Sequence, residues 1–427
     1  MKKRPSLKMF ASLFGRRKRY DPITGEESEK KIDLSESITD VGYYQEVSFR
    51  YHSAQMIAIM LLAVYFAVSV LTNAELLSAD SLIYFAKDLS SSIAMQESEA
   101  RESMIYSSDE DNDYGLYREG LVVLGSQKLT VFTASGRESH SHLLTYRTPR
   151  VVSSGRYLIA CDMGGKDVSV YNSFTCVKRI TTENNIRFVA ASNKGYYALV
   201  TDSVEYGGEV LLYNENHRMV NRYRLEQYTL MAALRQDGSE LALISVAAEE
   251  GRMQTHVSLV TPNGEEWGHS TVIPDAYPIA CHYTEENELL LVTTTGIYRF
   301  NEQLEPVARN SFSADNVLRF RATEEGCVLV CRDNVYDTAT RIIVFDKSTD
   351  QVYNISISSE VYDASYAYGV LAVLTKNELN VYRDGQSDPY ATASFNGEYT
   401  KLLAYDEDEF LVCGPAKAVV LSPNERH

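Results

Sequence analysis

The chain repeats a short pattern eight times, and this repetition limits its possible folds more than any other feature. Each copy contains an apolar run that follows a polar or glycine-containing turn. The runs begin at Leu121, Tyr157, Tyr197, Leu241, Leu289, Val328, Val370 and Phe410. Successive starts lie 36, 40, 44, 48, 39, 42 and 40 residues apart. Their average of about 41 is the usual length of one four-stranded propeller blade.

Four short segments recur in the same order in each copy. One copy has a first segment at 185–192, the apolar run from Tyr197, a third segment at 209–214 and a more polar fourth segment at 219–225. Such runs are rich in Val, Ile, Leu and Tyr and are separated by Gly, Asn and Asp, which is typical of antiparallel strands. The sequence therefore predicts an all-β fold, a β-propeller with eight four-stranded blades, and seven blades are the alternative.

The last copy is incomplete. After its third strand at 417–422 only five residues remain, so its outer strand must come from elsewhere in the chain. The segments 101–108 and 81–87, both before the first blade, are the two candidates. Either one would join the ends of the ring and cover an exposed sheet edge.

An uncharged segment precedes the repeats. The 22 residues between His52 and Glu75 contain no charge, and a helix over 54–73 would span the roughly 30 Å hydrocarbon core of a bilayer. A cleaved signal peptide and a buried core helix are the alternatives, but a leader of this length is unusual for a signal peptide. We therefore expect one transmembrane signal-anchor helix at 54–73.

Charge fixes the expected orientation of this anchor. The first 20 residues carry eight basic residues and no acid until Asp21, and basic flanks stay on the cytoplasmic side. This pattern predicts a largely disordered, basic cytoplasmic tail at 1–53, the anchor at 54–73, a juxtamembrane stalk at 74–100 and a β-propeller at 101–427 outside the cell membrane.

The predicted external part is strongly acidic. Residues 1–52 hold 11 of the 41 Lys and Arg and 8 of the 58 Asp and Glu. The rest therefore has 30 basic against 50 acidic residues, a net charge of −20, which disfavours nucleic acid and other polyanionic partners. All six cysteines fall in this part. Cys161, Cys331 and Cys413 each end an apolar run, where Cys acts as a small buried residue, and no C-x-x-C pair supports a zinc site.

One acidic segment is a candidate metal site. Asp109, Asp111 and Asp113 alternate before Gly115, and hard oxygen ligands on every second residue can converge on Ca²⁺. The Glu that such a loop needs at its twelfth position is replaced by Gly120. A solvated acidic turn is the alternative, and Ca²⁺ is the only cofactor for which the sequence offers any ligands.

Three other patterns have structural explanations. His140 and His142 in "SHSH" share a face of an expected outer strand, but no third metal ligand lies nearby. The glycine pairs of "GGKD" (164–167) and "YGGE" (206–209) occupy the same hairpin in neighbouring blades and do not precede a helix, as phosphate loops do. In "LRQDGSELALISV", Asp237 and Gly238 fit a tight turn between two strands. No catalytic motif or triad spacing stands out, so we name no catalytic residue and no cofactor-binding residue.

The ends of the third strands resemble a known class. An aromatic residue is followed by Asn or Asp at Tyr171–Asn172, Tyr213–Asn214, Phe300–Asn301 and Phe345–Asp346. This ending resembles the aromatic-Asp ending of WD-repeat and quinoprotein-type propellers over about residues 100–423. The one tryptophan, Trp267, is expected in a loop, whereas quinoprotein propellers carry a Trp in most blades. The whole plan is similar to that of an uncharacterised family of single-pass membrane proteins of Gram-positive bacteria, which implies topology but no activity.

These features favour a membrane-anchored, extracytoplasmic β-propeller that acts as a binding or scaffolding module of the cell envelope. Its loops on a rigid scaffold would bind an envelope protein or a glycan. One alternative is an envelope enzyme, a hydrolase or lyase, with its site at the propeller channel. Carboxylates and a His or Arg that converge there with shifted pKa values would favour the enzyme. The other alternative is a transmembrane sensor, which would need a dimer.

Overall fold

The computed structural model describes residues 19–20, 27–28, 51–52, 54–64, 103–107, 111–262, 267–284, 286–312, 316–323, 325–332, 339–383 and 385–425. The chain divides into two compact units, Met1–Ser78 and Ala79–His427. In the first unit, β1 (Arg19–Tyr20) pairs with β2 (Glu27–Ser28), and residues 51–52 and 54–64 are helical.

The predicted anchor at 54–73 is described only in part. Residues 54–64 form a helix, as expected, and 65–73 lie outside the described residues. Within the part of the chain that is described, no helix is both long enough and apolar enough to cross a membrane. The anchor therefore stays a prediction.

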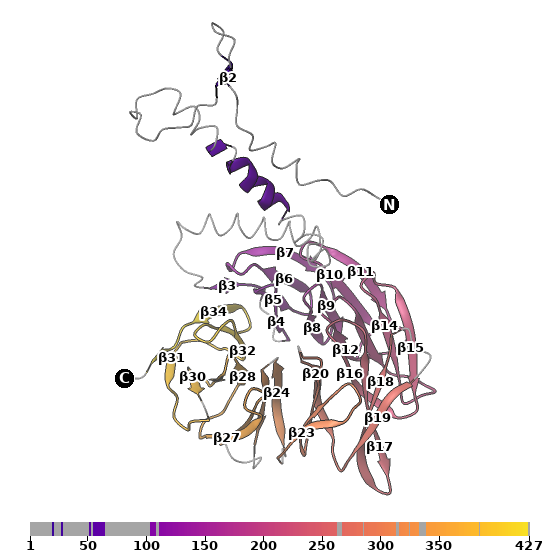
Figure 1. The fold of residues 1–427 in the computed structure, drawn as a ribbon. Coiled ribbons are helices and arrows are strands. Elements are labelled where there is room, and N and C mark those ends of the chain that lie inside the picture. The colour runs from indigo at the N-terminus through magenta and orange to yellow at the C-terminus, as the bar shows by residue number, and fades with distance from the viewer. Residues whose placement is uncertain are drawn as a thin grey trace, which may run out of the picture. The chain divides into compact units, whose positions relative to one another are not determined.

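The second unit contains eight antiparallel sheets that follow one another around a centre, within the described residues (Figure 1). Blade 1 contains β4 (Asp113–Tyr117), β5 (Gly120–Leu124), β6 (Lys128–Phe132) and β7 (Glu138–Leu143). Blade 2 contains β8 (Pro149–Ser153), β9 (Leu158–Asp162), β10 (Asp167–Tyr171) and β11 (Cys176–Thr181). Blade 3 contains β12 (Ile186–Ala191), β13 (Tyr197–Thr201), β14 (Gly208–Tyr213) and β15 (Met219–Leu225). Blade 4 contains β16 (Tyr228–Leu234), β17 (Leu241–Glu249), β18 (Arg252–Val260) and β19 (Trp267–Pro274).

The remaining blades continue the same order. Blade 5 contains β20 (Pro278–Tyr283), β21 (Leu289–Thr293), β22 (Gly296–Phe300) and β23 (Pro306–Ser311). Blade 6 contains β24 (Val317–Thr323), β25 (Gly326–Cys331), β26 (Thr340–Asp346) and β27 (Gln351–Ile357). Blade 7 contains β28 (Asp363–Ala367), β29 (Val370–Leu374), β30 (Glu378–Arg383), β31 (Ala391–Ser394) and β35 (Asn424–Glu425). Blade 8 contains β32 (Lys401–Ala404), β33 (Phe410–Cys413), β34 (Lys417–Leu421) and β3 (Met104–Ile105).

The apolar runs that revealed the repeat form the second strands. Each is buried along nearly its whole length, for example in β5, β13, β21 and β29, because both faces of this strand meet a neighbouring blade. The fourth strands lie at the rim and mix exposed with half-buried residues, as in β7 and β11. The prediction of eight four-stranded blades is confirmed.

Hydrophobic packing holds the blades to one another. Eight clusters of buried side chains are present in the described residues, and each joins two consecutive blades. Between blades 2 and 3, Tyr157 and Ile159 pack with Leu199 and Tyr213. Such burial contributes about 25 cal/mol per Å² of apolar surface, so the ring is stabilised by interfaces of one kind repeated around it.

The ring closes with a strand from the N-terminal side. Met104 and Ile105 of β3 pair with Ala418 and Lys417 of β34, so β3 lies beside β34 in Figure 1. The Tyr106 hydroxyl also donates to the Gly414 carbonyl at 2.6 Å. This confirms that the last blade borrows its outer strand, and it selects the segment 101–108 over 81–87. We call β3 the closing strand.

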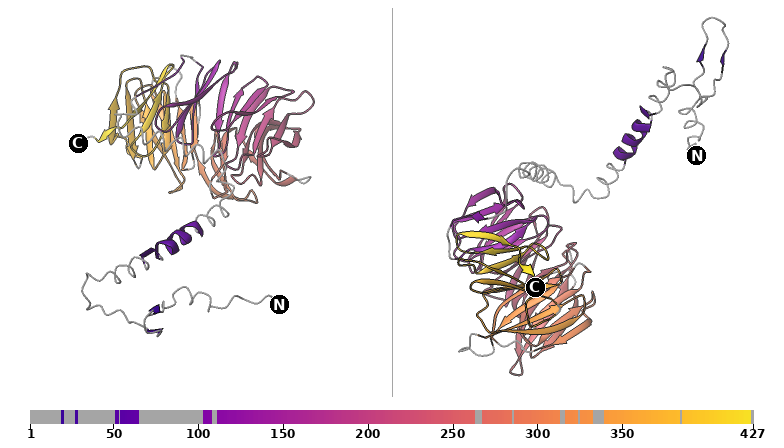
Figure 2. Two further views of the ribbon diagram at one scale, coloured as in Figure 1. Left: turned by 90° about the horizontal axis from the view of Figure 1, so that it is seen from above. Right: turned by 90° about the vertical axis from the view of Figure 1, so that its left-hand side faces the viewer.

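Two local features differ from expectation or were missed. Trp267 was expected in a loop, but it begins β19, where its backbone pairs with Val260. No element was predicted for the last five residues, and β35 adds to β31 at the rim of blade 7. In Figure 2 the mark of the C-terminus lies beside the yellow strands.

The Asn and Asp residues that follow the third strands have a clear structural role. Their side-chain oxygens accept backbone N–H groups two to four residues ahead, from Phe174 to Asn172, from Asn216 to Asn214 and from Gln303 to Asn301. Such side-chain turns shape the hairpin between the third and fourth strands. The resemblance to WD-repeat endings therefore reflects a shared need for a tight turn.

Candidate functional site

The first strand of every blade lines the centre of the propeller. Each of these inner strands contacts the next one around the ring, and β32 contacts β4 to complete the circle. The inner strands therefore enclose a central channel. Residues at the same level along the channel on neighbouring inner strands are about 40 positions apart in the sequence.

Four consecutive inner strands carry a bulge at the same height. In blades 3 to 6 the pairing with the second strand skips one residue. The skipped residues are Arg187, Leu230, Ile279 and Leu318. Bulges of this kind re-aim side chains beside functional sites. In blades 4 to 6 the skipped residue is apolar, and we call Leu230, Ile279 and Leu318 the apolar arc; Ile279 lines the cavity described below, while Leu230 packs against the cluster between blades 4 and 5.

The other blades keep regular pairing and place charges at that height. Asp363, Lys401 and Asp113 pair with the last residues of the second strands in blades 7, 8 and 1, and Arg150 pairs with the last but one in blade 2. Arg321 of blade 6 reaches the same group, since its Nη2 lies 2.6 Å from Asp363 Oδ2. The signs alternate around five consecutive blades, and we call these five residues the charged arc.

Both carboxylates of the charged arc join neighbouring inner strands. Asp113 Oδ2 accepts the backbone N–H of Val151 at 2.8 Å, and Asp363 Oδ2 accepts that of Leu402 at 2.9 Å. Each therefore links its own blade to the next one. Arg150 Nη1 lies 3.4 Å from Asp113 Oδ1. Arg321 also donates to the Leu402 carbonyl, which fixes its guanidinium across the inner end of blade 7.

Lys401 is the least satisfied member of the charged arc. Its Nζ lies 3.9 Å from Asp363 Oδ2, beyond hydrogen-bond distance. Burial lowers the pKa of its ammonium, the carboxylates of Asp363 and Asp113 raise it, and Arg321 and Arg150 lower it further. Lys401 thus lies within electrostatic range of all four other members.

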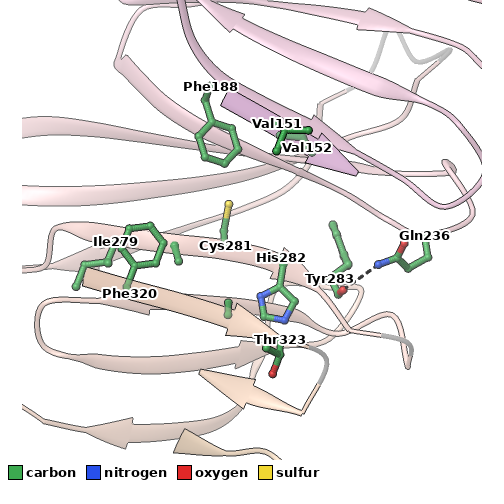
Figure 3. Close-up of a pocket in the computed structure, with 12 residues that line it drawn as sticks. Val151, Val152, Phe188, Gln236, Ile279, Cys281, His282, Tyr283, Phe320 and Thr323 are labelled. Atoms are coloured by element: carbon green, nitrogen blue, oxygen red, sulfur yellow. Dashed lines mark hydrogen bonds between the residues drawn. The ribbon is translucent and has the colours of Figure 1, made fainter. Parts of the chain in front are cut away.

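A cavity of about 590 Å³ lies in the channel next to the two arcs. Its walls come from β8, β12, β20 and β24, which belong to opposite sides of the ring (Figure 3). Val151, Val152, Phe188, Ile279 and Phe320 make much of it apolar. A pocket of this size and lining, with few polar groups, is typical of a site for a small molecule.

The polar lining of the cavity comes from Gln236, Cys281, His282, Tyr283 and Thr323. Burial lowers the pKa of His282 to about 4, so the imidazole is neutral at pH 7. In Figure 3 the ring lies beside Thr323, whose backbone opposes the larger effect of burial on the His282 pKa. On the adjacent position, burial raises the pKa of the Cys281 thiol, which keeps it protonated and a poor nucleophile.

Of the three predicted calcium ligands, the structure places Asp113 in a strand and Asp111 in the turn before it. Asp113 begins β4, where its carboxylate bonds to Val151 and Arg150. Asp111 lies in the turn before β4, and Asp109 lies outside the described residues. No group of three or more His, Cys, Asp or Glu side chains gathers as a metal site in the part of the chain that is described. The Ca²⁺ prediction stays open at Asp109 and Asp111, while Asp113 acts between blades.

The other candidates occupy the expected structural positions. His140 and His142 share one face of the outer strand β7, with ring centroids 5.3 Å apart, and His142 lies 5.0 Å from the ring of Tyr171. Asp237 Oδ1 accepts the backbone N–H of Ser239 at 2.9 Å in the turn between β16 and β17, and Gly238 has a φ of 73°. The glycine pairs lie in the hairpins between second and third strands of blades 2 and 3.

All six cysteines are free. Cys161, Cys331 and Cys413 are buried, as the apolar runs predicted. Cys327 and Cys331 both lie in β25. Their spacing along one strand is too large for a disulfide bond.

Comparisons with known proteins establish the fold and one family match. The crystal structure of BamB from Moraxella catarrhalis is similar with a TM-score of 0.52 and 9% identity, covering 76% of this chain and 99% of that chain. Kuenenia stuttgartiensis hydrazine synthase has a TM-score of 0.45 and 7% identity, covering 65% of this chain and 95% of that chain. A search of the curated proteins found no match. The model of a family of unknown function, DUF5711, matches residues 93–420.

Proposed function

We propose that this chain, which belongs to DUF5711, a family of unknown function, is a membrane-anchored binding or scaffolding module of the cell envelope. Its propeller would lie outside the cytoplasmic membrane and its basic tail inside. The observation that carries the binding role is the apolar cavity in the channel, whose neighbouring charged residues are held in contacts between blades.

The anchoring part of the proposal rests on the sequence. The 22 uncharged residues before Glu75 and the basic first 20 residues form the pattern of an uncleaved signal anchor with its N-terminus inside. The acidic propeller fits an envelope protein or a glycan as partner better than a polyanion. The rigid ring offers turns on both faces for such contacts.

An enzyme with its site in the channel is the second candidate, and one observation favours it. Carboxylates and arginines do converge there, and the pKa of Lys401 is lowered by burial. However, Asp113 and Asp363 each accept a backbone N–H and an arginine N–H. Both carboxylates are therefore engaged in holding neighbouring blades together. This structural use favours binding over acid–base catalysis by these two residues.

Topology can be tested by cysteine labelling of intact cells. Val204 is 95% exposed in the turn between β13 and β14, so V204C should react with a membrane-impermeant maleimide. S6C in the basic tail should react only after the membrane is opened. The parent chain gives the background, because most of its cysteines are buried. Labelling of S6C but not V204C in intact cells would overturn the proposed orientation.

The binding role needs the full-length protein in its own membrane. After mild crosslinking and purification, the expected result is repeated recovery of the same envelope protein or glycan. The control is a variant whose residues 54–73 are replaced by the membrane anchor of an unrelated protein. It shows which contacts are made by the helix alone. Recovery of no partner from several preparations would contradict the scaffolding role.

A further inference from the structure

We infer that the channel binds a small monoanionic amphiphile, with its acidic group at the charged arc and its apolar body in the cavity between Phe188, Ile279 and Phe320. This inference deepens the proposed function, because it names a ligand class for the same channel. It rests on four observations: exposed apolar side chains, an unbalanced charge, an ammonium open to a ligand, and charged residues that are chain neighbours of the cavity walls.

Apolar side chains lie open to the channel where a folded chain normally hides them. Phe320 is 51% exposed and Leu318 is 47% exposed on the inner strand of blade 6, and Phe320 forms part of the cavity wall. An apolar body that covers them would gain about 25 cal/mol per Å² removed from water. The volume of about 590 Å³ limits the ligand to the size of a small organic molecule.

The charged arc has one cation in excess. Arg321, Lys401 and Arg150 carry positive charge, and Asp363 and Asp113 carry negative charge. The chain as a whole has a net charge of −17, so this excess is opposite in sign to the surrounding protein. One added negative charge would neutralise the charged arc, whereas a cation would be repelled.

Lys401 supplies the group that an acid would meet. Its Nζ has no hydrogen bond within the described residues, and its closest carboxylate oxygen is 3.9 Å away. An ammonium has three N–H donors, and the Lys401 side chain is 31% exposed, so these donors are open to water or to a ligand. A carboxylate or phosphate placed on the channel side of Lys401 would satisfy them and would raise its lowered pKa.

Two members of the charged arc are direct chain neighbours of cavity walls. Their side chains point away from those walls along the strand, but consecutive Cα atoms are only about 3.8 Å apart, so a molecule in the cavity lies close to both. Arg150 precedes the wall residue Val151, and Phe320 precedes Arg321. Figure 3 shows Val151 and Phe188 on one side of the cavity and Ile279 and Phe320 on the other. An acidic group at the arc therefore leaves its apolar substituent between these walls.

The test uses the full chain in phosphatidylcholine nanodiscs and octanoate as probe. Isothermal titration calorimetry, corrected by titration into empty nanodiscs, should show that octanoate binds at least tenfold more tightly than octanol. Octylammonium should bind more weakly still. K401M should weaken octanoate binding about tenfold and leave octanol unchanged, while F320A should weaken both.

Matched controls separate the site from general effects. K376M removes an exposed lysine from a hairpin in blade 7, and L143A removes an exposed apolar side chain from the rim strand β7. Neither should alter octanoate binding. R150Q provides a second test of the charged arc if K401M does not fold, because Arg150 is more exposed than Lys401. R150Q should also weaken the binding of octanoate more than the binding of octanol.

A second arm distinguishes an acid that arrives from solution from one supplied by the membrane. Nanodiscs that contain oleate in the bilayer, with no octanoate present, are compared with nanodiscs that contain methyl oleate. A rise in the unfolding temperature of the propeller with oleate alone indicates supply from the bilayer. A rise only with added octanoate indicates supply from solution. Either result agrees with the inference.

Three results would overturn the inference: no binding of octanoate, equal binding of octanoate and octanol, or octanoate binding that K401M and R150Q leave unchanged. Each of them leaves the proposed function standing, because cysteine labelling and partner recovery do not depend on an occupied channel. Conversely, reversed labelling would remove the membrane proposal without affecting the octanoate titration.

Discussion

Single side chains in the channel stabilise the contacts between blades. Asp363 is 5% exposed at its side chain, and it accepts from Arg321 and from the backbone of Leu402. The ion pair of Arg321 and Asp363 joins blades 6, 7 and 8 through two largely buried charged groups. Removing one partner of such a pair leaves a buried charge without compensation.

We expect D363A to lower the free energy of unfolding by about 3 kcal/mol, because Arg321 and the Leu402 N–H both lose their acceptor. Urea unfolding followed by circular dichroism measures this change. R252A breaks the exposed pair of Arg252 with Asp275 and should change stability by less than about 0.5 kcal/mol. Equal effects of D363A and R252A would show that the charged arc does not join the blades.

His282 gives the protein a specific dependence on pH. Its pKa is lowered by burial from 6.5 to about 4 in the folded state. Between these pH values the unfolded chain binds a proton that the folded chain does not, so the folded state loses stability as the pH falls from 6.5 to about 4. The total loss from this group is about 3 kcal/mol.

H282L isolates this dependence from the titration of the carboxylates. The difference in unfolding free energy between the parent chain and H282L should shift against the parent chain as the pH falls from 7 to 4. Leu does not titrate, so H282L should lose less stability than the parent chain between pH 7 and pH 4. A difference that stays constant with pH would mean that His282 is not buried as described.

At the level of strands, most of the fold was visible in the sequence because local signals agree with it. Apolar runs of four or five residues predicted the second strands, and turn residues such as Asp237 and Gly238 marked their starts. The bulges at Arg187, Leu230 and Ile279 were not predicted. A bulge depends on the register against the neighbouring strand, and the sequence of one strand does not specify that register.

The channel was hidden from sequence reasoning for a related reason. Its charged residues lie at the starts of inner strands, where a polar residue looks like an ordinary turn residue. Asp113 and Lys401 are brought together only when blade 8 meets blade 1, from positions 288 residues apart along the chain. Asp113 was therefore assigned to a calcium loop from its neighbours in sequence, while its contacts are with the next blade.

The closing strand allows a comparison of two adjacent residues. Met104 is 3% exposed and packs in the cluster between blades 8 and 1, whereas Ile105 is 74% exposed. M104A should lower the free energy of unfolding by about 2 to 4 kcal/mol through lost burial and a cavity. I105A should lower the free energy of unfolding by less than about 0.5 kcal/mol. Similar losses from both would contradict the pairing of β3 with β34.

For the whole molecule, the closing strand sets the minimum length of a stable propeller. A chain of residues 101–427 keeps β3 and should show a circular dichroism spectrum dominated by strands and a cooperative thermal transition. A chain of 108–427 lacks β3 and Tyr106, exposes the edge of β34 and loses part of the cluster between blades 8 and 1. It should unfold at a clearly lower temperature. An unchanged temperature would show that the ring does not need this strand.

The position of the closing strand also determines how the propeller responds to force. Any tether attached before Met104 transmits its load first to the pairs Met104–Ala418 and Ile105–Lys417, and so to the contact that keeps the ring shut. The same blade holds Lys401 on its inner strand. A pull on the N-terminal segment is therefore applied to the blade that closes the ring and that also carries the lysine of the channel.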